Sequence, residues 1–193
     1  MNRTTLDRLL AAGGAVVAVV LVLAGVLLTW AHTYVHGQVR SQLAAEQIYF
    51  PAKGSDALAS TKIGPYLNKY AGKQLLTGPE AKTWADHYIA VHLQEMTGGK
   101  TYAQLSAQAQ ADPSNTKLAA EVDTVFRGET LRGLLLNAYA FDTMGTLALV
   151  SAVVAYLGAA VMAVLAALGV WHARRRPAPP SAVSSVQLDE AAG

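Results

Sequence analysis

The residues of this chain whose types and spacing could do chemistry are histidines, because the sequence contains no cysteine. His32 and His36 are four apart and would share one face of a helix, a spacing at which two imidazoles can ligate one metal ion. No acidic residue or cysteine lies close by in the sequence to complete such a site. The alternative is a pair of amphipathic residues at a membrane boundary, and the sequence favours that interpretation.

A second candidate is the pair His92 and Glu95, three residues apart, which could meet as carboxylate and histidine do in di-iron helical bundles. Such sites need matching carboxylates from several helices, and only this partial motif is present. His87 would diverge from His92 by about 140° around a helix, so these two imidazoles would not share an ion. We therefore predict no metal and no cofactor, with a metal-dependent enzyme as the alternative.

Motifs of other enzyme classes are also missing. The sequence has no Gly-x-Ser-x-Gly elbow, no phosphate-binding glycine-rich loop and no His-Glu-x-x-His pair, and the missing cysteines exclude a thiolate nucleophile. The pattern favours a protein that is not an enzyme.

Two long segments would position these residues. Leu9 to Val39 and Thr143 to Ala173 each contain no Asp, Glu, Lys or Arg. A helix crosses a hydrocarbon core of about 30 Å with roughly 20 apolar residues, so each run is long enough to span a bilayer. Trp30 and Tyr34 follow the first run, and Trp171 ends the second, as aromatic residues do at membrane interfaces. A cleaved signal peptide is the alternative for the first run, but that run is longer than a signal peptide requires.

Charge indicates the orientation of the two spans. The two tails hold five basic residues against three acidic ones, and the segment from Arg40 to Asp142 is neutral, with ten of each. Basic flanks stay on the cytoplasmic side, so both termini are predicted in the cytoplasm of a plasma-membrane protein. The predicted segments are a cytoplasmic N-terminus (1–8), a first transmembrane helix (9–31), an extracytoplasmic helical domain (32–142), a second transmembrane helix with its outer extension (143–171) and a disordered cytoplasmic tail (172–193).

The outside segment reads as helices without strands. Thr77 and Glu80 have the spacing of a capping box, and the apolar face behind them ends at Gly98. Thr101 begins a shorter helix, and Asp112 followed by proline predicts the cap of the next one. The predicted fold is an all-α membrane protein with two transmembrane helices and a small extracytoplasmic bundle built partly from their extensions.

Small residues recur at i, i+4 spacing along the second span, and small residues mark helix contacts in lipid. They are Ser151, Ala155, Ala159, Ala163 and Ala167. The first span offers Ala11 with Ala15 and Gly14 with Ala18 as complements. Contact inside the molecule is the favoured explanation, and a homodimer or larger complex is the alternative.

Arg127 and Arg132 stand just before the second span. Arg132 follows Glu129 at the spacing of an ordinary helical ion pair. The alternative function for both arginines is contact with lipid phosphates or with an acidic partner.

Three stretches resemble a family of small two-span membrane proteins from high-GC actinobacteria. They are Ala45 to Pro51, Gly98 to Tyr102 and Phe126 to Tyr139. Members of that family are often labelled aromatic ring-opening dioxygenase subunits, so the resemblance implies that name. A non-haem iron dioxygenase needs histidine and carboxylate ligands around an open coordination position, and no such set is visible in the sequence.

The predicted function is that of a non-catalytic accessory or scaffold component of a membrane or envelope assembly, which contacts membrane lipid and a protein partner. The formal net charge of +2 is too small for a nucleic-acid surface. Short tails leave no room for a cytoplasmic output domain. A lipid or small-ligand binding protein is a further alternative, and it would require an apolar cavity in the outside domain.

Overall fold

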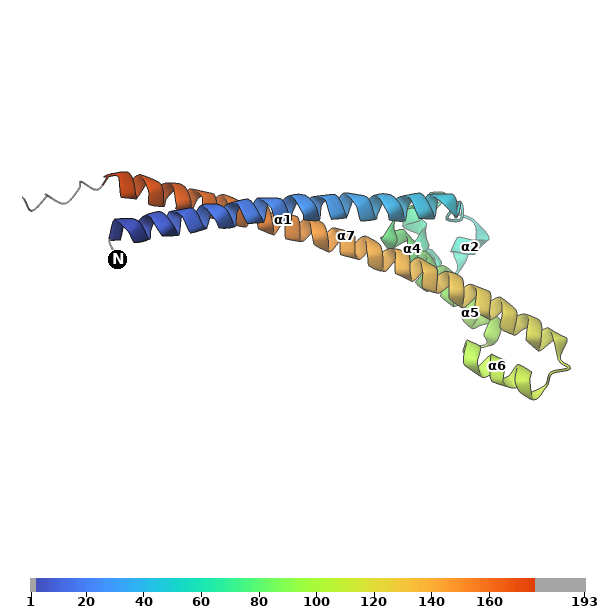
Figure 1. Ribbon diagram of the computed structural model, residues 1–193. Helices are drawn as coiled ribbons and strands as arrows, with labels where there is room; N and C mark the ends of the chain where they lie inside the picture. Colours follow the sequence, from blue (N-terminus) through green and yellow to red (C-terminus); the bar gives the residue numbers. More distant parts are fainter. Residues whose placement is uncertain (1–2, 176–193) are drawn as a thin grey trace, which may run out of the picture. The chain divides into compact units, whose positions relative to one another are not determined.

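The computed structural model describes residues 3–175, and every named element in that range is helical (Figure 1). The long helices are α1 (Arg3–Ala45) and α7 (Thr116–Arg175). The shorter elements are α2 (Asp56–Ala59), α3 (Gly64–Leu67), the 3₁₀ turn η1 (Asn68–Tyr70), α4 (Gly78–Trp84), the π-helical segment η2 (Ala85–Ile89), α5 (Ala90–Thr97) and α6 (Tyr102–Ala111). The predicted all-α class is thereby confirmed for the described residues. The tail beyond Arg175 lies outside them.

Both long helices contain a stretch that is long and apolar enough to cross a membrane. In each, only 17% of the most apolar 18-residue window is buried inside the chain. The core helix of a water-soluble protein would hide most of such a surface. The apolar side chains of α1 and α7 therefore need cover from outside the chain, which a bilayer would supply.

The described chain forms two compact units by its internal contacts. The first consists of the described residues of Met1–Val26 and Val153–Gly193, and the second is Leu27–Ala152. In the first unit, α1 and α7 approach through small residues: a Cβ on Gly14 would lie 3.6 Å from the Ala166 Cβ, and one on Gly169 would lie 3.3 Å from the Ala11 Cβ. Close packing of small residues is the usual way in which helices associate in lipid.

The buried positions of α7 differ from the predicted ridge of small residues. Ala152, Ala159 and Ala166 are buried and lie seven residues apart. Half-buried Ala155 lies three residues after Ala152 and four before Ala159. The steps average 3.5 residues, as in a left-handed coiled coil. Of the five ridge residues, Ala159 is buried, Ala155 is half-buried, and the other three, Ser151, Ala163 and Ala167, are exposed. A strict i, i+4 series turns about 40° around the helix at each step, so it cannot remain on one face.

Complementary positions on α1 follow the same alternation. Ala11 and Ala18 are buried and Gly14 is half-buried, whereas Ala15 is exposed. Of the predicted complements, Ala11, Gly14 and Ala18 therefore lie on the face of α1 that is covered within the chain, whereas Ala15 does not.

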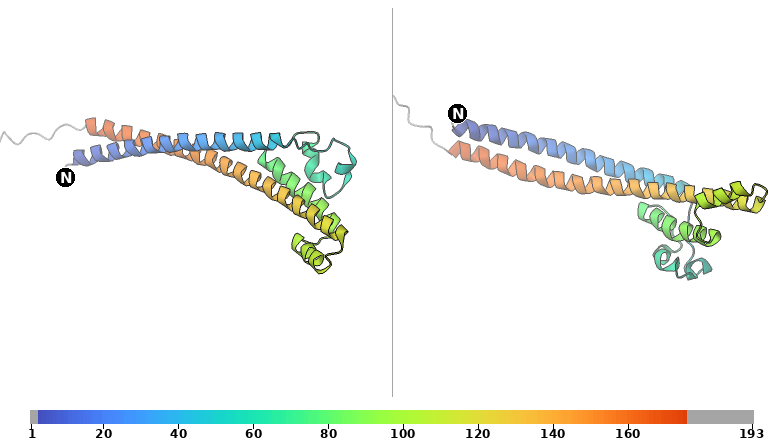
Figure 2. Two further views of the ribbon diagram at one scale, coloured as in Figure 1. Left: turned by 45° about the vertical axis from the view of Figure 1, so that its right-hand side comes forward. Right: turned by 90° about the horizontal axis from the view of Figure 1, so that it is seen from below.

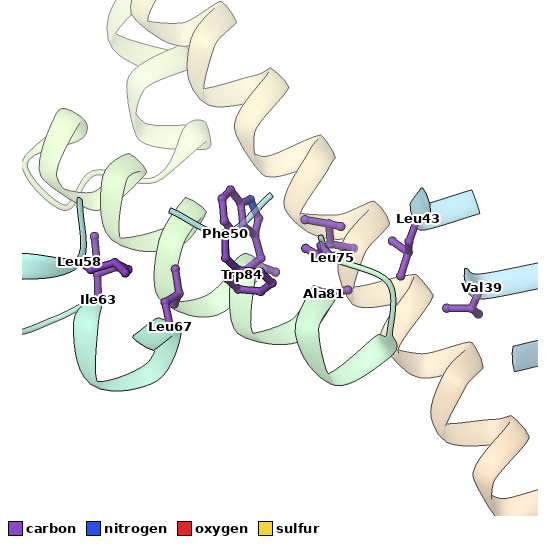
Figure 3. Close-up of a cluster of buried hydrophobic side chains, with 11 residues drawn as sticks. Val39, Leu43, Phe50, Leu58, Ile63, Leu67, Leu75, Ala81 and Trp84 are labelled. Carbon is purple, nitrogen blue, oxygen red and sulfur yellow. The ribbon is translucent and has the colours of Figure 1, made fainter. Parts of the chain in front are cut away.

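The second unit has a hydrophobic core to which α1, α4 and α7 all contribute. Phe50 is 2% exposed and meets the Trp84 ring edge-on, with centroids 5.2 Å apart (Figure 3). Leu67 and Leu75 are fully buried, and Val39 and Leu43 bring α1 into the same cluster. The core therefore rests on α1 and α7, the same two helices that carry the apolar stretches.

The segment after α1 reaches this core in an extended form. The Phe50 N–H donates to the Lys73 carbonyl over 2.8 Å, and the Leu75 N–H donates to the Ile48 carbonyl over 2.9 Å. This antiparallel pairing supplies hydrogen-bond partners to backbone groups of the segment that follows α1. The Phe50 ring points into the core. Neighbouring Tyr49 is 58% exposed, so only part of the aromatic segment enters the core.

Local sequence signals place most helix ends correctly. The Glu80 carboxylate accepts hydrogen bonds from the Leu76 and Thr77 N–H groups over 2.9 Å, at the predicted start of α4. Gly98 ends α5 in the left-handed region at φ 61°, which favours glycine. Thr101 begins α6, and its hydroxyl accepts from the Gln104 N–H.

The predicted cap at Asp112 is wrong. The Asp112 carboxylate accepts hydrogen bonds from the side chains of Ser114 and Asn115, and Asn115 supplies the cap of α7 by accepting from the Leu118 N–H over 3.0 Å. From Thr116, α7 then continues without interruption, with α6 lying alongside its first turns in both views of Figure 2.

Candidate functional site

A group of polar side chains between α1 and α7 of the second unit surrounds Asp142. The His36 Nδ1 lies 2.9 Å from the Asp142 Oδ1, and the Asp142 side chain is only 11% exposed. The His36 ring also contacts the ring of His32, with centroids 4.4 Å apart, and the His32 Nδ1 is 2.9 Å from the Gly145 carbonyl oxygen. Both histidines of α1 are thus hydrogen-bonded to α7.

Two glycines allow this approach. A Cβ on Gly145 would lie 2.8 Å from the His36 Cδ2, and one on Gly78 would lie 2.4 Å from the Asp142 Cβ. Real Cβ atoms do not come that close to other carbons. The first residue of α4 therefore packs directly against Asp142, while His36 approaches the carboxylate from α1.

The cluster contains a hydroxyl, an imidazole and a carboxylate in the order used by nucleophilic hydrolases. The Thr146 Oγ1 is 3.5 Å from the His36 Nε2, on the far side of the ring from Asp142. However, the same hydroxyl also donates to the Asp142 carbonyl one turn earlier over 3.1 Å. The N–H groups of α1 and α7 around Thr146 lie in the interior of two long helices, where they bond within the helix and are not free to bind an oxyanion. The arrangement suits a polar contact that fastens two helices.

Of the two candidate metal pairs, His32 and His36 are in contact, whereas His92 and Glu95 have separate partners. Among the described residues, no group of three or more His, Cys, Asp and Glu side chains could hold a metal ion. The His92 Nδ1 lies 2.7 Å from the carbonyl of Tyr88, whereas Glu95 pairs with Lys62 over 3.2 Å. His87 stacks on Tyr66 instead, with centroids 3.5 Å apart.

Arg127 and Arg132 are both paired with carboxylates in the structure. Arg127 lies 2.9 Å from Asp123 on the same helix. Arg132 lies 3.2 Å from Glu129 and 3.6 Å from Asp86, which belongs to η2. Arg132 therefore connects η2 to α7.

Asp86 lies between two cations. Burial would raise the pKa of this carboxyl, but the hydrogen bond from the Lys82 ammonium, the charge of Lys82 and the charge of Arg132 together lower the pKa below its ordinary value of 3.8. The carboxylate stays ionised and holds the π-helical segment in place. Segments of this kind are rare and often occur at functional sites.

A groove runs between α1 and α7 on the surface of the second unit, with a volume of about 600 Å³. Its apolar lining includes Tyr34 of α1 and, on α7, Leu131, Leu134, Ala138 and Phe141. Leu134 and Phe141 are 60% and 58% exposed, so the groove is open to one side. Its floor contains Val39, Leu43 and Leu135, which also belong to the core.

Polar groups along the groove lie mostly on α1 and just after it. Gln38, Gln42 and Asn137 contribute amides, and Glu46 is the single charged residue of the lining. Among the residues that the structure describes, no lysine or arginine lines the groove. It therefore suits an apolar ligand whose polar end is uncharged or carries a positive group.

Sequence reasoning missed Asp142 as the partner of His36 because the two residues are far apart in the chain. A signal was nevertheless present. Asp142 lies seven residues after buried Leu135 and is followed by buried Gly145 and Ala152, so it lies on the buried face of α7. An acidic residue on an otherwise apolar packing face requires a partner. The histidines of α1 could have been tested for that role.

Comparisons of this chain with protein-family models, with curated proteins and with solved structures found no match.

Proposed function

We propose that this chain is a two-pass integral membrane protein with both termini in the cytoplasm. Residues 32–142, called the helical unit below, lie outside, where they act by binding as an accessory or scaffold component. The observation that carries the proposal is that α1 and α7 supply the two apolar stretches and also contribute Val39, Leu43 and Leu135 to the core of the helical unit. A unit built on two membrane helices stays at the membrane surface and presents its faces there to lipids and neighbouring proteins.

Aromatic and basic side chains support this placement at both ends of the spans. Trp30 and Tyr34 stack with centroids 5.5 Å apart after the apolar part of α1. Near the end of α7 the Arg175 guanidinium lies 3.8 Å from the centroid of the Trp171 ring. Stacked aromatic rings suit an interface, and basic residues after a span favour the cytoplasmic side.

The absence of cysteine from the chain makes the topology simple to test. Single cysteines at Asn2, Lys53 and Ser114 would be labelled in intact cells with a membrane-impermeant maleimide, and again after permeabilisation. We expect labelling of Lys53→Cys and Ser114→Cys in intact cells, and of Asn2→Cys only after permeabilisation. Labelling of Asn2→Cys in intact cells would contradict the topology.

The scaffold role requires a protein neighbour. Tyr102 of α6 and Phe126 of α7 form an exposed aromatic pair with centroids 5.7 Å apart, which is a suitable contact surface. A photo-crosslinking amino acid at Phe126 should capture one recurrent membrane or envelope protein, and one at exposed Lys53 should not. If purified protein instead held stoichiometric iron, zinc or copper that His32→Ala removed, the metal-dependent enzyme would replace this proposal.

A further inference from the structure

The groove between α1 and α7 has the dimensions of one lipid chain. Leu131 and Phe141 mark its two ends on α7, ten residues apart, so its length is about 15 Å at the helical rise of 1.5 Å per residue. One leaflet of a hydrocarbon core of about 30 Å contains chains that extend roughly 15 Å. The groove volume of about 600 Å³ lies within the range of sites that bind small molecules.

One end of the groove adjoins the membrane boundary of the proposed topology. Tyr34 and Phe141 line that end, and Tyr34 stacks on Trp30 where the apolar part of α1 ends. Leu131 and Glu46 line the opposite end. A lipid that moved outward along α7 by about one leaflet would exchange bilayer contacts for contacts with the apolar walls of the groove.

The charge of the lining selects among headgroups. A lipid that kept its orientation would bring its headgroup to the end with Glu46, whose carboxylate repels anionic groups and attracts ammonium groups. The amides of Gln38 and Gln42 offer hydrogen bonds to ester or hydroxyl oxygens along the way. The lining contains no cation that could hold a phosphate or a free carboxylate.

A partner helix fits this space less well. A helix of about 10 Å diameter and 15 Å length occupies roughly 1,200 Å³, about twice the groove volume, so only one of its faces could enter. Continuity with the membrane boundary and the acidic far end both favour a lipid.

We propose that the groove holds a single hydrocarbon chain of an outer-leaflet lipid with a zwitterionic or neutral headgroup. This inference rests on the proposed membrane topology for the source of the lipid, and it would make the helical unit a lipid-binding component.

Photo-crosslinking tests the site. The protein would be reconstituted in phosphatidylcholine vesicles with a trace of lysophosphatidylcholine that carries a diazirine on its chain. We expect label on the peptides that contain Tyr34 to Glu46 and Leu131 to Phe141. Leu134→Gln should reduce this labelling about tenfold, the factor for losing burial of one large apolar side chain. Met96→Gln on α5, 43% exposed and outside the groove, is the control and should label like wild type.

Headgroup selection supplies a second readout. A diazirine lysophosphatidylglycerol with the same chain should label wild type less than the choline lipid does, and Glu46→Lys should reverse that preference. Label spread evenly over the helical unit, or unchanged labelling of Leu134→Gln, would overturn the inference. A cross-link between two copies through Leu134 would overturn it in favour of a second chain.

Native mass spectrometry in detergent separates this inference from the topology. Bound lysophosphatidylcholine that is lost in Leu134→Gln would support the groove whatever the cysteine labelling shows. If the cysteine labelling agrees with the topology and the groove binds no lipid in either assay, the groove inference fails and the proposed membrane placement remains.

Discussion

Gly78→Ala is the substitution that tests the packing around Asp142 most directly. The added Cβ would lie 2.4 Å from the Asp142 Cβ and 2.8 Å from its Cγ, whereas ordinary van der Waals contact between carbon atoms begins at about 3.5 Å. Either α4 moves away from α7, or Asp142 moves away from His36. Overpacking of this kind costs about 1–3 kcal/mol of unfolding free energy.

Gly133→Ala is the matched control for this change. Gly133 lies within the same helix as Asp142, and a Cβ there would meet nothing within 4 Å. Alanine is a better helix former than glycine by about 1 kcal/mol, so this variant should be slightly more stable than wild type. The two alanine variants should therefore differ by roughly 2–4 kcal/mol.

Urea unfolding in detergent, followed by the fluorescence of Trp84, measures the difference. Trp84 is 9% exposed and packs against Phe50, so its emission reports the core of the helical unit. Trp30→Phe and Trp171→Phe would first remove the other two tryptophans. Equal unfolding midpoints for the two alanine variants would refute the close approach of α4 to Asp142.

Three further predictions concern other parts of the chain. Leu75→Ala should lower the unfolding free energy of the helical unit by about 2–5 kcal/mol in the same urea assay, because Leu75 is fully buried in the core. Gly14→Cys with Ala166→Cys should form an intramolecular disulfide on mild oxidation, seen by gel mobility, because the two Cβ atoms would lie 3.6 Å apart. Asp86 stabilises the fold fully above its ordinary pKa of 3.8, since its folded pKa is lower, and this contribution should disappear as the pH falls through the folded value. Asp86→Asn should lack that acid-dependent part of the unfolding free energy.

Each of these predictions has a control. Leu134→Ala, at a site 60% exposed, should change stability by less than about 0.5 kcal/mol. Gly13→Cys paired with Ala166→Cys should not form the intramolecular disulfide, since a Cβ on Gly13 meets nothing within 4 Å. Disulfide-linked dimers instead of monomers would contradict the contact within one chain. Equal loss of stability in acid for wild type and Asp86→Asn would contradict the role of that carboxylate.

Helix ends were predictable wherever the signal was local. Glu80 begins α4 and Gly98 ends α5 because a side chain or a backbone angle within a few residues decides those ends. The failure at Asp112 has the same origin, since Asn115 stands three residues later as an equally good cap. Both side chains could cap α7, but the Asp112 carboxylate accepts hydrogen bonds from the side chains of Ser114 and Asn115 instead.

Helix faces were harder to predict than helix ends. Alanine is so frequent in α7 that several spacings could be read from it, and the strict i, i+4 series included exposed Ala163. The alternation of three and four residues that buries Ala159 and Ala166 keeps one face toward a partner helix. Contacts between residues distant in the chain, such as His36 with Asp142, follow from that register and not from any local motif.

We expect the polar pair to fix the register of α1 on α7. A face of small residues repeated every seven positions can slide by one repeat with little loss of contact, whereas His36 meets Asp142 in only one alignment. Replacing both residues by leucine should leave the unfolding free energy equal or higher, because a polar pair inside a protein often stabilises less than apolar side chains of similar size. Cross-linking would nevertheless report a change. Gly14→Cys with Ala166→Cys, whose Cβ atoms would lie 3.6 Å apart, should form a disulfide with the natural pair and far less with the two leucines. An unchanged yield would show that the apolar contacts alone set the alignment.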